Sequence, residues 1–115
     1  MRIAIIALIL SAGPLAAGSY DGIYRPDADW AQGWDCTSIG MDGGALAIRD
    51  NTFYGVESAC EMTNPTAIRD MDATLFDMQC SAEGDTYQAR VMLMSTPEGV
   101  LVIRDGGDTS RLIHC

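Results

Sequence analysis

The residues best suited to chemistry are aspartates that lie close together in the sequence. Asp70 and Asp72 are separated by one residue, and Asp105 and Asp108 flank two glycines. Carboxylate oxygens on short loops are ligands that calcium prefers, so both groups are candidates for a calcium site. Neither has the ligand spacing and terminal glutamate of an EF-hand. Aspartates also initiate turns by accepting hydrogen bonds from nearby N–H groups, and the sequence favours this second interpretation and predicts no metal centre.

Catalytic and redox chemistry have little support. His114 is the only histidine, and it precedes a cysteine that we expect to be bonded, so a general base paired with a nucleophile is disfavoured. With 16 acidic residues, carboxylate pairs are inevitable and indicate nothing. Scattered methionines favour core filling over copper binding: Met41, Met62, Met71, Met78, Met92 and Met94. We therefore predict a protein without catalytic residues or a cofactor.

Four cysteines predict a disulfide framework: Cys36, Cys60, Cys80 and Cys115. None forms a CxxC pair, which argues against zinc and against a redox motif. Three pairings are possible. We prefer Cys60–Cys80 with Cys36–Cys115, since the second bond would tie the last residue to the start of the first expected strand.

The N-terminus predicts export. Arg2 precedes the apolar run Ile3–Leu10, and small residues follow Pro14, which is typical of a cleavable signal peptide over residues 1–18 with cleavage near Gly18. The apolar run is too short to span a membrane. We expect a periplasmic or secreted protein without a membrane span, in which a monomer is favoured.

The net charge restricts the classes of partner that the protein can bind. The chain carries 7 basic against 16 acidic residues, a formal net charge of −9. Such a chain repels phosphate backbones, so nucleic-acid binding is disfavoured. A basic protein or a divalent cation would be attracted.

The elements that must position these residues are predicted to be strands. Residues 19–35 are rich in aromatic side chains, Asp and Gly without periodicity, and we expect an irregular leader whose aromatic side chains cover the core. The domain itself is predicted over residues 36–115. Two-residue alternation separated by turn residues indicates strands at 45–49, 52–57, 73–80, 86–95, 100–104 and 109–115, with a loop at 62–66. Asp50-Asn51 is expected to form a two-residue hairpin turn between the first two of these strands. In the range 86–95 we expect one shared face for Tyr87, Ala89, Val91 and Leu93. We predict an all-β antiparallel meander of six or seven strands that closes into a barrel or curled sheet.

One tripeptide recurs where strands are expected to end. Ile-Arg-Asp occurs at 48–50, 68–70 and 103–105. We expect the Ile to point inward, the Arg outward and the Asp to initiate a turn.

The cysteine pattern carries a resemblance. Trp34, Cys36, Cys60, a Cys80-x-x-Glu83-Gly84 turn and Cys115 resemble the layout of small exported proteins of unknown function that are common in alphaproteobacteria. The resemblance covers nearly the whole chain after residue 18. It implies a periplasmic location and a compact β fold, and no activity.

A second resemblance is local. Ser81, Ala82, Glu83, Gly84 and Tyr87 are similar to the Ser-Gly-Ala loop with which periplasmic inhibitors of c-type lysozyme enter the lysozyme cleft. Glu83 replaces a serine of that loop, and Asp85 replaces an alanine. The resemblance implies an inhibitor of a basic hydrolase as the alternative to a binding domain without an identified partner.

Overall fold

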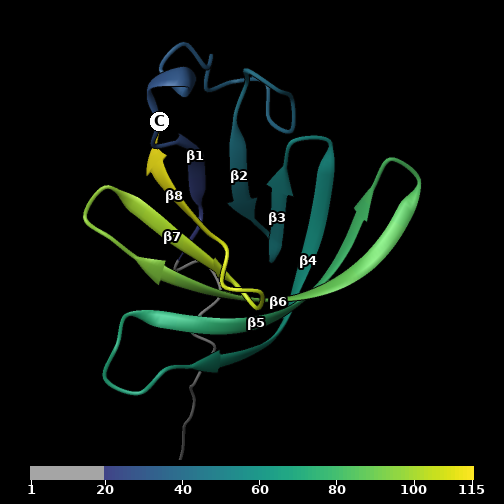
Figure 1. Ribbon diagram of the computed structural model, residues 1–115, viewed down its shortest axis with the longest axis vertical. Coiled ribbons are helices and arrows are strands. Elements are labelled where there is room, and N and C mark those ends of the chain that lie inside the picture. The colour runs from purple at the N-terminus through teal and green to yellow at the C-terminus, as the bar shows by residue number, and fades with distance from the viewer. Residues whose placement is uncertain (1–19) are drawn as a thin grey trace, which may run out of the picture.

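The computed structural model describes residues 20–115, and the predicted signal peptide therefore lies outside the described residues. Its elements are β1 (Gly22–Pro26), η1 (Asp29–Ala31), β2 (Leu46–Arg49), β3 (Thr52–Gly55), β4 (Ser58–Ala67), β5 (Ala73–Ala82), β6 (Asp85–Ser95), β7 (Gly99–Arg104) and β8 (Thr109–His114). Each strand pairs antiparallel with the next, and β8 pairs with β1 (Figure 1). The predicted all-β antiparallel barrel is confirmed, with eight strands instead of six or seven.

Two strands, β1 and β4, lie outside the six expected ranges, and β1 lies in the segment expected to be an irregular leader. Its five residues pair with β2 and β8 over three positions each. Only Tyr24 is buried in β1, so the segment lacks the alternation that identifies a strand. The segment is a strand because it pairs with β2 and β8, although its own sequence has no strand pattern.

The predicted loop at 62–66 is wrong, because these residues belong to β4, a strand that the sequence did not predict. Pro65 has no N–H to donate, and a sheet tolerates it at a bulge. The register with β5 shifts between Thr63 and Thr66, and Asn64 has a φ of +51°. The bulge therefore accommodates the proline that pointed to a loop.

Two of the hairpin turns have positive φ at both central residues. Asp50 and Asn51, between β2 and β3, both have positive φ, as do Glu83 and Gly84 between β5 and β6. Positive φ at both central residues is the type I′ geometry that suits the twist of a hairpin. The predicted Asp50-Asn51 hairpin is confirmed.

The core lies inside the barrel and takes buried side chains from every strand except β3, whose Phe53 is partly buried against it. It includes Leu46, Met78, Leu93 and Val102, each at most 8% exposed. Tyr20 packs edge-on against Phe76, and its hydroxyl lies 2.9 Å from Thr74 Oγ1. Burial raises the pKa of Tyr20, which keeps its hydroxyl protonated and able to donate.

Both disulfides take the pairing that the sequence favoured. Cys60 and Cys80 stand opposite each other on β4 and β5, and Cys36 in the β1–β2 connection is bonded to Cys115 after β8. The C-terminus accordingly lies beside β1 and the segment that carries η1 (Figure 1). The Cys36–Cys115 bond ties the β1–β2 connection to the end of β8, the strand that closes the barrel with β1.

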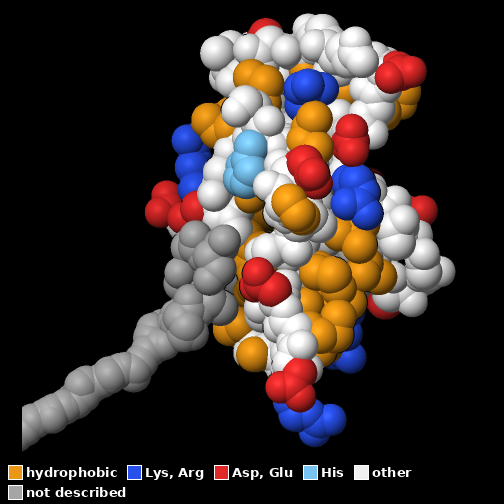
Figure 2. All heavy atoms as spheres, turned by 90° about the vertical axis from the view of Figure 1, so that its left-hand side faces the viewer, with side chains coloured by type: hydrophobic (Ala, Val, Ile, Leu, Met, Phe, Trp, Pro, Cys, Tyr) orange, Lys and Arg blue, Asp and Glu red, His pale blue; other side chains and the backbone are white. Residues whose placement is uncertain are grey.

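The outer surface has its own apolar area. The register places Leu75, Met92 and Ile103 side by side on the outer face of β5, β6 and β7, and each is partly exposed. In Figure 2 hydrophobic side chains gather in the lower part of the face turned to the viewer, and others are scattered among acidic and basic side chains above them.

Candidate ligand pocket

A pocket opens at one end of the barrel. In an up-and-down barrel, the connections that follow β1, β3, β5 and β7 lie at the same end. Residues from all four connections, or from the strand ends beside them, line a single hollow of about 660 Å³. This volume falls within the roughly 300–1,000 Å³ of ordinary small-molecule sites.

The floor and wall of the pocket are apolar. Met78, Val91, Val102 and Leu112 belong to the core and also line the pocket. The Cys60–Cys80 disulfide contributes a further apolar surface on the β4–β5 side. A ligand seated here would contact hydrocarbon and sulfur over most of its surface.

The rim of the pocket exposes large hydrophobic side chains. Trp30, Val56 and Tyr87 line it and are 71%, 41% and 50% exposed. They come from three separate segments: the helical turn after β1, the β3–β4 turn and β6. Aromatic side chains at a pocket mouth combine apolar contact with a polar edge, which suits a ligand that enters from water.

Arg104 is the charged side chain on the inner face of the pocket. It is the last residue of β7, opposite Val91 and in alternation with the buried Val100 and Val102. Its Nη1 donates to Ser110 Oγ at 3.0 Å and lies 3.7 Å from Asp108 Oδ2. The prediction that this arginine points outward is wrong. All of residues 100–103 are apolar, so the sequence pattern did not reveal which face is internal.

The predicted partner loop lies at the tip of the β5–β6 hairpin. Ser81, Glu83, Gly84 and Asp85 are exposed there, and Ala82 is partly exposed. This hairpin, drawn in green, extends beyond the neighbouring strands on the right of Figure 1. Tyr87 lies just below the tip and connects it to the pocket rim.

The aspartates considered for calcium lie in two different connections. Asp70 and Asp72 are exposed in the β4–β5 connection, whereas Asp105 and Asp108 lie in the β7–β8 connection. Within residues 20–115, no group of three or more His, Cys, Asp or Glu side chains is arranged to hold a metal ion. In this part of the chain Asp108 instead pairs with Arg104.

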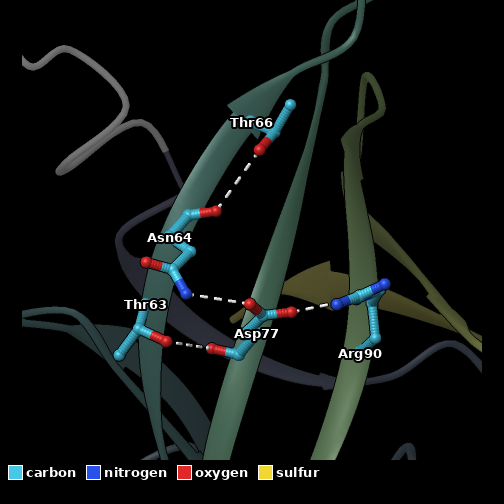
Figure 3. A network of polar contacts seen from close by, with 5 residues as sticks. All are labelled: Thr63, Asn64, Thr66, Asp77 and Arg90. Carbon is cyan, nitrogen blue, oxygen red and sulfur yellow. Dashed lines mark hydrogen bonds and ion pairs between the residues drawn. The ribbon is translucent and has the colours of Figure 1, made fainter.

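A polar network on the outer face supports the bulge in β4. Asp77 accepts hydrogen bonds from Asn64 Nδ2 and Arg90 Nε, both at 2.9 Å (Figure 3). These two bonds hold the pKa of Asp77 below its usual range, with Asn64 having the larger effect. Thr63 Oγ1 also donates to the Asp77 carbonyl oxygen. The network stabilises the irregular part of β4 and places no group in the pocket.

His114 lies away from the pocket, at the last position of β8. Its ring stacks on Tyr24 with 4.7 Å between the ring centroids. This contact gives the only histidine a packing role at the β1–β8 junction.

Comparisons with protein-family models, with curated proteins and with solved structures found no match to this chain. Among the described residues, no helix is long and apolar enough to cross a membrane. The sequence had placed Tyr87, Ala89 and Val91 on one face, and all three line the pocket. It missed the pocket itself because the lining comes from strands distant in sequence.

Proposed function

We propose that this protein is a non-enzymatic binding protein that takes an apolar small molecule into the open end of its barrel. The observation that carries the proposal is the pocket of about 660 Å³ whose floor is the hydrophobic core. Transfer of apolar ligand surface out of water supplies roughly 25 cal/mol per Å². The exposed hydrophobic rim supports the same function, because exposed large hydrophobic groups around a hollow are typical of binding sites.

We also propose that binding takes place outside the cytosol and by a monomer. Residues 1–18 have the pattern of a signal peptide, and two disulfides suit an oxidising compartment. Over residues 20–115 every strand of the barrel has two neighbours, which leaves no open sheet edge in this part of the chain to recruit a second copy.

The test is binding of a neutral hydrophobic fluorophore, Nile red, to the disulfide-bonded protein. Ala89 lines the pocket and is partly buried, so Ala89→Trp fills part of the volume. Ala67→Trp is the matched control, since Ala67 is exposed on β4 and does not line the pocket. We expect Ala89→Trp to weaken binding at least tenfold and Ala67→Trp to leave it unchanged. Equal binding by both variants would contradict the proposal, provided that circular dichroism shows both folded.

A second candidate function is inhibition of a basic hydrolase such as c-type lysozyme through residues 81–85. The observation that favours it is the exposure of Ser81, Glu83 and Asp85 at the tip of the extended β5–β6 hairpin. A net charge of −9 would speed encounter with a basic enzyme.

This second candidate is tested with purified protein against c-type lysozyme at low salt, where charge attraction is strongest. Inhibition at micromolar concentration that is lost in Glu83→Lys, but retained in the remote Glu61→Lys, would support it. An unchanged lysozyme rate at low salt would remove it.

Calcium binding by Asp70 and Asp72, or by Asp105 and Asp108, has the least support. A rise in melting temperature when EDTA is replaced by millimolar calcium would favour it. An unchanged melting temperature would exclude a calcium site that stabilises the fold.

A further inference from the structure

We infer that the pocket selects an amphipathic anion: an apolar chain that ends in a carboxylate, with the chain over the core residues and the carboxylate against Arg104. This inference rests on the proposed binding function and specifies the chemistry of its ligand.

The first support is the position of Arg104. It occupies an inner-face position, where burial otherwise selects Val100, Val102 and Val91. Its side chain is 42% exposed, so the guanidinium stays charged and partly hydrated at this position. The pocket therefore combines an apolar floor with a positive group near its mouth, which is the distribution that an amphipathic anion complements.

The second support is the unused hydrogen-bonding capacity of that side chain. A guanidinium has five N–H groups in a planar fork that matches a carboxylate. The hydrogen bond to Ser110 Oγ uses one of these groups, and the contact with Asp108 at 3.7 Å is too long for a hydrogen bond. Ser110 accepts from Arg104, so its own hydroxyl proton is free to be donated to a second acceptor beside the guanidinium.

The contact with Asp108 is easily replaced. The Asp108 side chain is 79% exposed, and exposed ion pairs of this kind contribute little to stability. A carboxylate carried on a chain that is already seated in the pocket would be presented to Arg104 at high effective concentration. The ligand would thus displace Asp108 toward solvent, at small cost.

The net charge of −9 does not prevent a ligand carboxylate from binding next to Arg104. Salt screens exposed charges beyond roughly 8 Å at physiological ionic strength. Four charged residues line the pocket: Asp27, Asp105 and Arg111 are exposed, whereas Arg104 is part-buried on the inner face. Arg104 is therefore the charged group beside the apolar floor.

The test compares three ligands with the same twelve-carbon chain: dodecanoate, dodecanol and dodecyltrimethylammonium. Displacement of Nile red from the full disulfide-bonded protein is measured for each ligand, below the critical micelle concentration of the two ionic ligands and below the solubility limit of dodecanol. Arg104→Gln removes the charge, and Arg69→Gln is the matched control, because Arg69 is 93% exposed on the β4–β5 connection at the other end of the barrel. Both variants change the net charge by the same amount.

We expect the wild-type protein to bind dodecanoate about tenfold more tightly than dodecanol, the size of effect typical of a charge-assisted hydrogen bond. Arg104→Gln should abolish this preference without changing dodecanol binding, and Arg69→Gln should keep it. Equal binding of dodecanoate and dodecanol by the wild type, or tighter binding of the cation, would overturn the inference while leaving the proposed function standing. Displacement by none of the three ligands, together with no Nile red binding, would overturn both.

Discussion

Removal of the Cys36–Cys115 disulfide should destabilise the protein by about 4 kcal/mol. The bond spans 79 residues, and the loop-entropy relation gives about 4.5 kcal/mol at 25 °C for a loop of that length. The second disulfide lies inside this loop and spans 20 residues, which reduces the effective loop to roughly 59 residues and the contribution to about 4.2 kcal/mol. Because Cys36 and Cys115 are not fully buried, little packing energy should be added.

The assay is urea unfolding of Cys36→Ala/Cys115→Ala, followed by the fluorescence of Trp30 and Trp34. Both tryptophans lie in the connection that carries Cys36, and their rings are 6.0 Å apart. With an m-value of about 2 kcal/mol/M, the midpoint should fall by roughly 2 M. The slope should also rise, because the unfolded chain without the bond exposes more surface.

The comparison variant is Cys60→Ala/Cys80→Ala. Its 20-residue loop gives about 3.3 kcal/mol of entropy, to which loss of the Cys80 side chain, only 4% exposed, adds a packing cost. A loss of less than about 1.5 kcal/mol in Cys36→Ala/Cys115→Ala would contradict the loop-entropy value. That result would mean that the unfolded chain is already constrained without the bond.

Three further predictions concern the local structure. Hydrogen bonds from the backbone of Ser38 and then of Thr37 lower the pKa of Asp35 to about 2. The carboxylate therefore stabilises the fold above pH 4, and this stabilisation is lost as the pH falls toward 2. Over that range the melting temperature of Asp35→Asn should fall less than that of the wild type. Tyr20→Phe removes a buried hydroxyl contact and should cost about 1 kcal/mol in urea unfolding, and no change would show that water satisfies the site equally well. Gly84→Val should cost about 1–2 kcal/mol through the φ of +86° alone, since nothing lies within 4 Å of an added Cβ, and Nile red binding should be retained.

The sequence predicted the strands whose two faces differ in polarity. In β5, Phe76, Met78 and Cys80 alternate with Leu75, Asp77 and Gln79, and the first three are buried. The Asp50-Asn51 turn was predictable because few residue pairs accept positive φ at both positions. β1 was not predictable, since its place depends on β2 and β8 and not on its own pattern.

The pocket could be predicted only in part. Tyr87 and Ala89 followed from alternation in β6, and Trp30 was expected to cover an end of the core. The orientation of Arg104 depends on which of two apolar faces of β7 turns inward. The pairing of Arg104 with Val91 of β6 determines which face is internal, and the sequence of β7 alone does not reveal this pairing.

The pairing of the first strand with the last also sets the order of events when the chain folds. Tyr24 pairs with His114, so a chain emerging N-terminus first cannot complete its barrel until β8 is free. Hairpins such as β5–β6 can form early from local contacts, but closure must wait for contacts of the greatest sequence separation. A chain of this topology stays incompletely folded throughout its emergence, the state in which a polypeptide can still be threaded through a narrow channel.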